Sequence, residues 1–230
     1  MSLPADPATV FVVIPAYNEQ EVITGTLQGL LPLGYNIVVV DDGSATDLQE
    51  WLSGWPVTIL RHPVNLGQGA ALQTGIEYAL SAQARYVVTF DADGQHRPED
   101  IQPLLQPLLN EEADIVLGSR FLSKDHQVPA GRRRLLKTAR LVNYLFTGLL
   151  LTDAHNGLRA MNQKAASTIT LRQTGMAHAT EIIAEIRKKR LRYKEVPVMI
   201  RYTAYSRGKG QTLWSGFRIF FDILLNKIFR

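Results

Sequence analysis

The 230-residue sequence contains no cysteine, which excludes disulfide bridges and thiolate metal sites. Any bound metal must therefore take oxygen or imidazole ligands. The sequence also lacks the Gly-Lys-Ser/Thr ending of a Walker A loop and the three-glycine spacing of a dinucleotide fingerprint. These two absences count against P-loop nucleotide hydrolysis and hydride transfer.

Signals for export and for spanning a membrane are also missing. The segment from Met1 to Thr9 holds Asp6 and two prolines but no basic region followed by an apolar run, so we predict no secretory signal. The apolar stretches Leu141–Thr152 and Leu213–Phe229 are too short, or too interrupted by charge, to cross a bilayer comfortably. We therefore expect a cytoplasmic protein.

Composition is sufficient for one sizeable α/β domain, because hydrophobic residues make up 46% of the chain. The formal net charge of +4 predicts an anionic partner. Charge alone leaves nucleic acid, an acidic membrane leaflet and a phosphorylated substrate open.

Short β-branched runs alternate with helical periodicity in the first half of the chain, which predicts a mostly parallel sheet flanked by helices. The predicted strands are Val10–Ile14, Ile37–Val40, Val57–Leu60, Tyr86–Phe90 and Ile115–Leu117. The predicted helices are Gln20–Leu31, Asp47–Leu52, Leu66–Ala82 and Glu99–Asn110, with start signals at Asn18, Asp47 and Pro98. Ligands of such sheets bind at the carboxyl ends of the strands, so we expect the chemistry there.

The second half of the chain follows another pattern. A loop with Pro129, Gly131 and Arg132–Arg134 leads to an apolar stretch near Leu135–Leu151. Beyond it we predict a helix at Ala179–Arg190, a strand at Leu191–Tyr202, a loop at Ser206–Gly210 and a terminal helix at Leu213–Arg230.

An acidic motif follows the strand that is predicted to end at Phe90. Its residues are Asp91, Ala92, Asp93, Gly94, Gln95 and His96. Two carboxylates and an amide are hard oxygen donors that suit Mg²⁺ or Mn²⁺, and a metal there would neutralise a diphosphate leaving group. Taken alone, such a motif is also compatible with a solvated acidic turn.

Polar motifs follow the first two strands at the same expected edge. Pro15-Ala16-Tyr17-Asn18-Glu19 offers a ring for stacking, and Asp41-Asp42-Gly43-Ser44 offers a carboxylate for a nucleobase or ribose. Helix capping is the alternative role of Asn18 and Ser44. A third segment, Asn65-Leu66-Gly67-Gln68-Gly69, is a glycine-bearing turn at a helix start, whose backbone N–H groups can approach a phosphate or sugar.

In this order, the motifs resemble the inverting glycosyltransferases of family 2 with the GT-A fold, especially the dolichyl- or polyprenyl-phosphate sugar synthase branch. The resemblance extends to Gly118-Ser119-Arg120, Asn156-Gly157-Leu158-Arg159, Glu195-Val196-Pro197 with Arg201, and Ser206-Arg207-Gly208-Lys209. It implies a GT-A domain over residues 1–212, with a nucleotide and metal half at about 8–118 and an acceptor half at about 119–212.

The resemblance also implies roles for individual residues. The nucleotide-sugar site would comprise Pro15, Ala16, Tyr17, Asn18, Glu19, Asp41, Asp42, Gly43, Ser44, Asn65, Gly67, Gln68, Asp91, Ala92 and Asp93. Asp91, Asp93 and Gln95 would hold Mg²⁺ or Mn²⁺, while Arg120, Arg159, Arg201, Arg207 and Lys209 would bind phosphates of donor and acceptor. Asp91, Asp93, Asp153 and Arg120 are the predicted catalytic residues.

The acceptor decides whether a base is needed. A polyprenyl phosphate is already anionic and requires positioning and electrostatics, whereas a sugar hydroxyl of a lipid-linked polysaccharide must lose a proton to a carboxylate. Asp153 is the candidate base, and a turn or cap residue is its alternative role. A noncatalytic nucleotide-sugar-binding subunit of a membrane complex is a hypothesis of another class.

Two further segments concern partners. The Leu213–Arg230 helix has a wide apolar face with Lys227 and Arg230, so it would lie on the inner face of the cytoplasmic membrane or pack against protein, such as a small membrane partner. The basic run Arg187–Lys194 is typical of a solvated helix end, and we predict no nucleic-acid partner. The sequence leaves homo-oligomerisation open.

Overall fold

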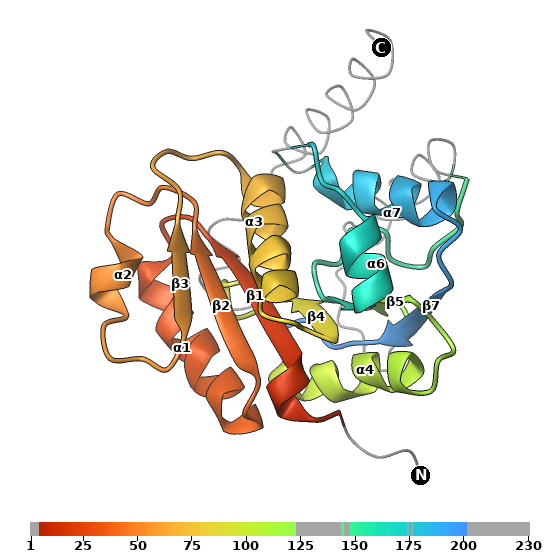
Figure 1. Ribbon diagram of the computed structural model, residues 1–230, viewed down its shortest axis with the longest axis horizontal. Coiled ribbons are helices and arrows are strands. Elements are labelled where there is room, and N and C mark those ends of the chain that lie inside the picture. Colours follow the sequence, from red (N-terminus) through yellow and green to blue (C-terminus); the bar gives the residue numbers. More distant parts are fainter. Residues whose placement is uncertain (1–4, 123–143, 145–147, 174, 176, 202–230) are drawn as a thin grey trace, which may run out of the picture.

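The computed structural model describes residues 5–122, 144, 148–173, 175 and 177–201 (Figure 1). Several predictions lie outside these residues. They are Arg207, Lys209, the loops at 129–134 and 206–210, and the terminal helix at 213–230.

Seven strands of the described residues form one sheet in the order β3-β2-β1-β4-β6-β5-β7. Strand β6 runs antiparallel to both of its neighbours, and every other pair is parallel. The predicted mostly parallel sheet is therefore confirmed. The strands are β1 (Val10–Ala16), β2 (Asn36–Asp41), β3 (Thr58–Arg61), β4 (Tyr86–Thr89), β5 (Ile115–Ser119), β6 (Arg159–Asn162) and β7 (Tyr193–Pro197).

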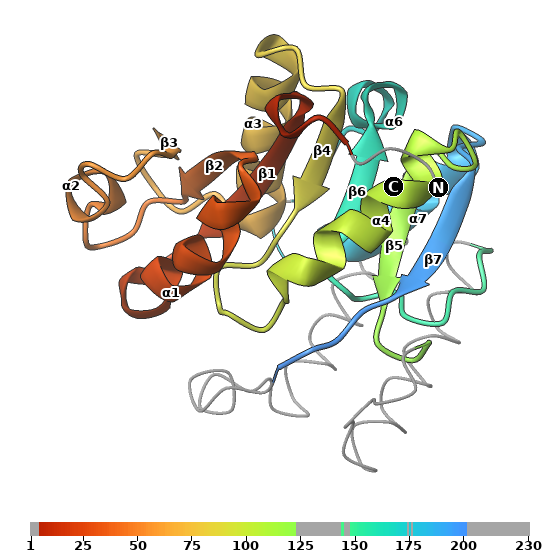
Figure 2. The ribbon, with the colours of Figure 1, turned by 90° about the horizontal axis from the view of Figure 1, so that it is seen from below.

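Helices cover both faces of the sheet, as the two perpendicular views show (Figures 1 and 2). Helices α1 and α4 lie on one face, and α3, α6 and α7 lie on the other. The helices are α1 (Gln20–Leu30), α2 (Leu48–Trp51), α3 (Gln68–Ser81), α4 (Ile101–Leu109), α6 (Gln163–Thr168) and α7 (His178–Lys188), with 3-10 turns at Pro7–Thr9, Leu31–Leu33 and Pro98–Asp100.

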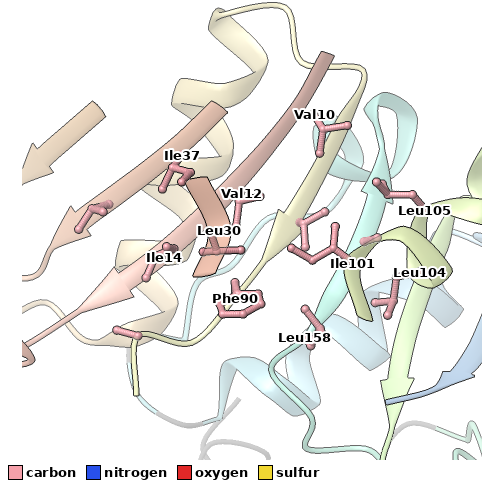
Figure 3. Close-up of a cluster of buried hydrophobic side chains, with 14 of the residues drawn as sticks. Val10, Val12, Ile14, Leu30, Ile37, Phe90, Ile101, Leu104, Leu105 and Leu158 are labelled. Carbon is pink, nitrogen blue, oxygen red and sulfur yellow. The ribbon is translucent and has the colours of Figure 1, made fainter. Parts of the chain in front are cut away.

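Strand β1 shows how the sheet divides the hydrophobic core. All of its residues are buried, and successive side chains point to opposite faces. Val10, Val12 and Ile14 pack toward α1 and α4 (Figure 3), whereas Phe11 and Val13 pack toward α3. A strand buried on both faces reads as a continuous apolar run, which is why the sequence revealed it readily.

Helix α3 lies unusually close to the central strands. A Cβ atom on Gly75 would be 2.3 Å from Cγ1 of Val13 and 3.1 Å from Cγ2 of Val40. Only glycine permits this approach, so the distance between α3 and the sheet is set by a missing side chain.

Most predicted elements agree with the structure to within a few residues, and three differences are informative. Asn18 does not cap α1, because its φ is +54° and Glu19 occupies the N-cap position. Strand β6 and helix α6 were not predicted, since β6 has only four residues and begins with a charged one. The predicted strand at 191–202 is shorter: β7 ends at Pro197, and of the described residues that follow it, up to 201, Ile200 alone forms a bridge, with His96. Asp47, in contrast, caps α2 as predicted.

Within the part of the chain that the structure describes, no helix is both long and apolar enough to cross a membrane.

Candidate active site

Three of the predicted motifs meet at one edge of the sheet. Strands β2, β1 and β4 are adjacent and parallel, so their carboxyl ends bring together the segments after Ala16, Asp41 and Thr89. The fourth, glycine-bearing segment precedes α3, which begins at Gln68. The amide side chain of Gln68 donates a hydrogen bond to Oδ1 of Asp91 at 3.2 Å, so the start of α3 faces the acidic loop.

Asn18 and Ser44 link the loops after β1 and β2. The backbone N–H of Asn18 donates to Oγ of Ser44, and the backbone N–H of Ala45 donates to Oδ1 of Asn18, each at 2.9 Å. Neither side chain caps a helix, in contrast to the alternative considered from the sequence. They hold the two loops at a defined separation instead, with Tyr17 46% exposed beside them.

Asp42 is almost completely buried and organises the glycine-bearing turn. Its carboxylate accepts hydrogen bonds from the backbone N–H groups of Leu66 (2.9 Å) and Gly67 (2.7 Å) and contacts Nδ1 of His62 at 2.7 Å. The other ring nitrogen of His62 lies 2.9 Å from Oγ1 of Thr74 on α3. Asp42 thus supports the loop that precedes α3, a role that the sequence did not indicate.

Asp41 and Gly43 shape the loop after β2. Asp41 is fully buried and accepts a hydrogen bond from the backbone N–H of Ser44 at 2.9 Å, and it lies 3.5 Å from Arg61. Gly43 has φ +72°, and a Cβ atom there would be 2.5 Å from the carbonyl carbon of Val64. The glycine is therefore required both by its backbone conformation and by the neighbouring loop.

Asp91 is the most closely supported carboxylate of the acidic loop. Besides Gln68, it contacts Nε2 of His96 through Oδ2 at 2.8 Å, and its side chain remains 31% exposed. Desolvation opposes its ionisation, but His96 and, more weakly, Arg159 and His178 hold the pKa of Asp91 below its usual value. Asp91 is consequently an anion at neutral pH.

Asp93 and Gln95 complete the acidic loop. Oδ1 of Asp93 accepts a hydrogen bond from the backbone N–H of Gln95 at 3.0 Å, and Oδ2 accepts one from the Gln95 side chain. Burial raises the pKa of Asp93, and the negative charge of Asp91 raises it further. The two carboxylates are thus close enough to repel each other, and a cation would relieve that repulsion.

The donor set of this loop fits a hard divalent cation. The candidate ligands are the two carboxylates of Asp91 and Asp93 and the side-chain amide of Gln95. Among the described residues, no group of three or more His, Cys, Asp and Glu side chains is arranged to hold a metal ion without such an amide. Mg²⁺ and Mn²⁺ suit such oxygen donors, and Mg²⁺ often relies on substrate phosphates for its remaining ligands.

The chain after β7 returns to the acidic loop. The backbone N–H of Arg201 donates to the carbonyl of Gln95 at 2.9 Å, and Ile200 forms a bridge with His96. Arg201 is exposed. The structure therefore brings this predicted phosphate ligand next to the predicted metal ligands.

Arg120 follows β5 and forms a tight pair with Asp153. Oδ2 of Asp153 accepts hydrogen bonds from Nε of Arg120 at 2.6 Å and from its backbone N–H at 3.1 Å. The Asp153 side chain is only 1% exposed. This geometry argues against the predicted catalytic base, because the Asp153 carboxylate is buried and bound to Arg120, so it is not presented to an acceptor at the surface.

Arg159 occupies a different place from the predicted one. It lies on β6 and is 2% exposed, so it does not present its guanidinium to a phosphate at the surface. Burial lowers the pKa of Arg159 to about 10, although the charges of Asp91 and Asp153 favour the cation. The residue is an interior counter-charge to these two carboxylates rather than an exposed anion ligand.

The basic run at 187–194 lies away from this site. The carbonyl of Arg192 accepts hydrogen bonds from Asp114 and Ile115, where β5 begins, whereas Arg120 follows the other end of β5. Arg192 also donates side-chain hydrogen bonds to the buried Asp114. This part of the run is bound to the protein at the edge opposite the acidic loop.

Three site residues were not given roles from the sequence. His62 supports Asp42, His96 supports Asp91, and Glu195 binds the turn that carries Asp153. Only the latter two stand inside recognised motifs, and no spacing rule indicates the contacts that they make.

The fold is an α/β domain of the GT-A type. Its acidic loop lies at the carboxyl ends of the parallel strands β2, β1 and β4. Residues 11–170 match the family model described as glycosyl transferase family 2, and the chain belongs to that family. It is therefore a glycosyltransferase, as the resemblance implied.

Known relatives support this assignment. An uncharacterized protein of Methanocaldococcus jannaschii is 40% identical over 225 residues, which cover 96% of this chain and 93% of the relative. The UDP-N-acetylglucosamine–dolichyl-phosphate N-acetylglucosaminyltransferase of Methanococcus voltae is 31% identical over 241 residues. The match covers 95% of this chain and 96% of that relative.

A solved structure supports the fold. It is glucosyl-3-phosphoglycerate synthase from Mycobacterium tuberculosis in complex with Mn²⁺, UDP and glucosyl-3-phosphoglycerate. The two folds superpose with a TM-score of 0.65 at 19% identity, over 88% of this chain and 75% of that one.

Proposed function

We propose that this glycosyltransferase transfers a sugar, with inversion, from a UDP- or GDP-sugar to a polyprenyl phosphate in cell-envelope glycan biosynthesis. The Methanococcus voltae relative is named for this type of reaction, with a UDP-sugar donor and a dolichyl-phosphate acceptor. Its match extends over nearly the whole of both chains, which favours a shared class of acceptor.

The pair of Arg120 and Asp153 is the observation that carries the proposal. Transfer to a sugar hydroxyl needs a carboxylate that is free to take a proton, and Asp153 is committed to Arg120 at 2.6 Å. A phosphate acceptor needs no such base, and it needs a cation, which Arg120 and Arg201 supply at this edge. The geometry therefore favours the phosphate acceptor over the hydroxyl of a lipid-linked polysaccharide.

We assign the donor to the loops after β1, β2 and β4. Tyr17 offers an exposed ring for the base, and the side-chain amide of Gln68 at the start of α3 lies beside the acidic loop. The backbone N–H groups of Leu66 and Gly67 are bound to Asp42, so they hold the turn rather than the donor. Asp91, Asp93 and Gln95 would hold Mg²⁺ or Mn²⁺, which supplies charge neutralisation for the diphosphate leaving group when bound. The Mn²⁺ and UDP in the Mycobacterium tuberculosis structure support this assignment.

The domain division and the location also remain part of the proposal. Residues 8–118 would form the nucleotide half and 119–212 the acceptor half, and the segment 213–230 would attach the enzyme to the inner face of the cytoplasmic membrane. Removal of 213–230 should abolish binding to anionic vesicles while the catalytic domain stays folded. Loss of folding instead would indicate that the segment packs on the domain.

Transfer of radiolabelled sugar tests the reaction. Panels of UDP- and GDP-sugars are incubated with undecaprenyl or dolichyl phosphate and with Mg²⁺, Mn²⁺ or EDTA, and label is counted in the lipid phase. Metal-dependent label is expected from one donor class. Label that enters a lipid-linked saccharide but neither lipid phosphate would refute the proposed acceptor.

Substitution of Asp93 tests the metal site separately. Asp93→Asn removes one negative charge with little change of shape, and it should weaken Mn²⁺-dependent donor binding and slow transfer by about 10²-fold or more. Isothermal titration with UDP in Mn²⁺ and in EDTA measures the binding effect. Equal UDP affinity of the variant and the parent enzyme in Mn²⁺ would exclude this carboxylate as a ligand.

A further inference from the structure

Glu195 on β7 binds the turn that carries Asp153. Its Oε1 accepts hydrogen bonds from the backbone N–H of Thr152 (2.8 Å), from Oγ1 of Thr152 (2.6 Å) and from the backbone N–H of Asp153 (3.1 Å). Its Oε2 accepts from the Thr152 N–H as well, at 3.0 Å. One side chain thus satisfies every hydrogen-bond donor that Thr152 has.

The same turn is joined to the end of β5 through two hydroxyl groups. Oγ of Ser119 lies 2.6 Å from Oγ1 of Thr152. Because the Thr152 hydroxyl gives its only hydrogen to Glu195, the Ser119 hydroxyl must donate to Thr152. Ser119 in turn accepts a hydrogen bond from the backbone N–H of Phe121, at 3.3 Å. The direction of each bond in this chain is therefore determined.

Arg120 lies between these two attachments. Its neighbours Ser119 and Phe121 take part in the hydroxyl chain, and its Nε and backbone N–H donate to Asp153. In the described part of the chain, the structure records no hydrogen bond from the terminal Nη atoms of Arg120. A guanidinium held at Nε keeps both Nη groups for a planar, two-point contact with an anion.

We propose that Glu195, through Thr152 and Asp153, positions the Arg120 guanidinium for a phosphate group of the substrate. The inference rests on the proposed function and deepens it. Asp153 supports Arg120 directly. Glu195, on the edge strand β7, acts one step further away from Arg120, through Thr152 and Asp153. Neither carboxylate takes a proton from the acceptor.

The register of the sheet explains why Glu195 can do this. Strands β5 and β7 are parallel, and Glu195 pairs with Leu117, two residues before β5 ends at Ser119. The side chain therefore starts from a rigid element close to Arg120, and its placement does not depend on loop conformation. Functional groups supported from strands are held more accurately than groups supported from loops.

A double-mutant cycle separates positioning from a general structural role. Glu195→Gln replaces the acceptor-only carboxylate with an amide of the same shape, and Arg120→Ala removes the positioned group. We measure KM for undecaprenyl phosphate, KM for the donor, kcat and the melting temperature for both single variants and the double variant. The matched control is Glu112→Gln. Glu112 binds Lys194, the neighbour of Glu195 on β7, at 2.5 Å, but it lies near the edge of the sheet opposite the acidic loop.

Glu195→Gln is expected to raise the KM for the lipid phosphate about tenfold, the size of one charge-assisted hydrogen bond, with the donor KM within twofold of the parent value. The same substitution should have no further effect when Arg120 is already alanine, because the effect passes through Arg120. Glu112→Gln should leave both KM values unchanged. The inference would be overturned if the double variant raised the KM for the lipid phosphate by the product of the two single effects.

A milder variant keeps the test decisive if Glu195→Gln does not fold. Thr152→Val removes only the hydroxyl link and should raise the same KM about threefold, again only in the presence of Arg120. Equal effects of Thr152→Val with and without Arg120 would count against positioning.

Failure of the proposed acceptor is recognised separately. If the parent enzyme transfers no sugar to a lipid phosphate, the proposed function fails, and the cycle is then applied to the binding constant of the nucleotide-sugar donor. Positioning would still be supported if Arg120→Ala and Glu195→Gln each lowered the donor affinity and the double variant bound the donor no more weakly than Arg120→Ala alone. Unchanged donor affinity in Arg120→Ala would overturn it.

Discussion

Gly157→Ala should damage the acidic loop without changing any charged residue. A Cβ atom at position 157 would lie 2.3 Å from Oδ2 of Asp91 and 2.8 Å from its Cγ and Oδ1. The backbone of Gly157 is outside the left-handed region, so alanine is strained only by this contact. Ordinary contacts are close to 3.5 Å, so the Asp91 carboxylate must move by about 1 Å.

The displacement has a predictable cost in activity. Oδ2 of Asp91 is both the atom that the new methyl group meets and the atom that contacts His96 at 2.8 Å. A misplacement of about 1 Å in a catalytic group can reduce the rate by about 10²-fold. This factor corresponds to about 2.7 kcal/mol in activation free energy. The cost in folding stability should be nearer to 1 kcal/mol, the low end for overpacking, because Asp91 is 31% exposed and can move toward solvent.

Steady-state transfer in saturating Mn²⁺ measures the first quantity, and urea denaturation measures the second. Gly25→Ala is the matched control, because a Cβ atom at this position in α1 meets nothing within 4 Å. The control should keep parental kcat/KM and gain about 0.5–1 kcal/mol in stability from the lower entropy of the unfolded chain. Parental kcat/KM in Gly157→Ala would refute the assignment of Asp91 to the reacting centre.

Three further predictions concern stability and support of the site. Asp114→Asn should lower the free energy of unfolding at pH 7 by about 1.5–3 kcal/mol, because hydrogen bonds from Arg192 hold the pKa of this buried carboxyl well below its usual value. That stabilisation is present above the unfolded-state pKa and is lost as the pH falls below about 4. The difference in unfolding free energy between parent and variant, measured by urea denaturation, should therefore shrink at low pH. An equal difference at pH 7 and pH 3 would contradict the ion pair between Asp114 and Arg192 as its source. Burial lowers the pKa of His178 to about 4, so between pH 6.5 and pH 4 the unfolded chain binds the extra proton and stability falls with falling pH. His178→Gln should flatten this slope, and an unchanged slope would show that another group is responsible. His62→Leu, which leaves the buried Asp42 without one of its partners, should cost about 1–3 kcal/mol in stability and raise the donor KM, whereas an unchanged donor KM would show that the turn before α3 does not need this support.

Much of the fold was predictable because local patterns determine it. Strand β1 is buried on both faces and reads as a continuous apolar run, and Asp47 caps α2 through its own side chain. The order of strands and helices then implies a parallel sheet, whose carboxyl ends collect the loops. The predicted metal and nucleotide motifs could therefore be assigned to one edge from the sequence alone.

The tertiary structure alone decided how individual side chains are used. Asp153 reads as a free carboxylate in the sequence, but the fold pairs it with Arg120, 33 residues earlier. Arg159 reads as a surface cation, but an unpredicted antiparallel strand buries it beneath the acidic loop. Glu195 and Thr152 are separated by 43 residues and meet only because β7 lies beside β5. Local periodicity specifies which faces are buried, whereas contacts over such separations depend on the strand order and register, and these determine which charges remain free to act.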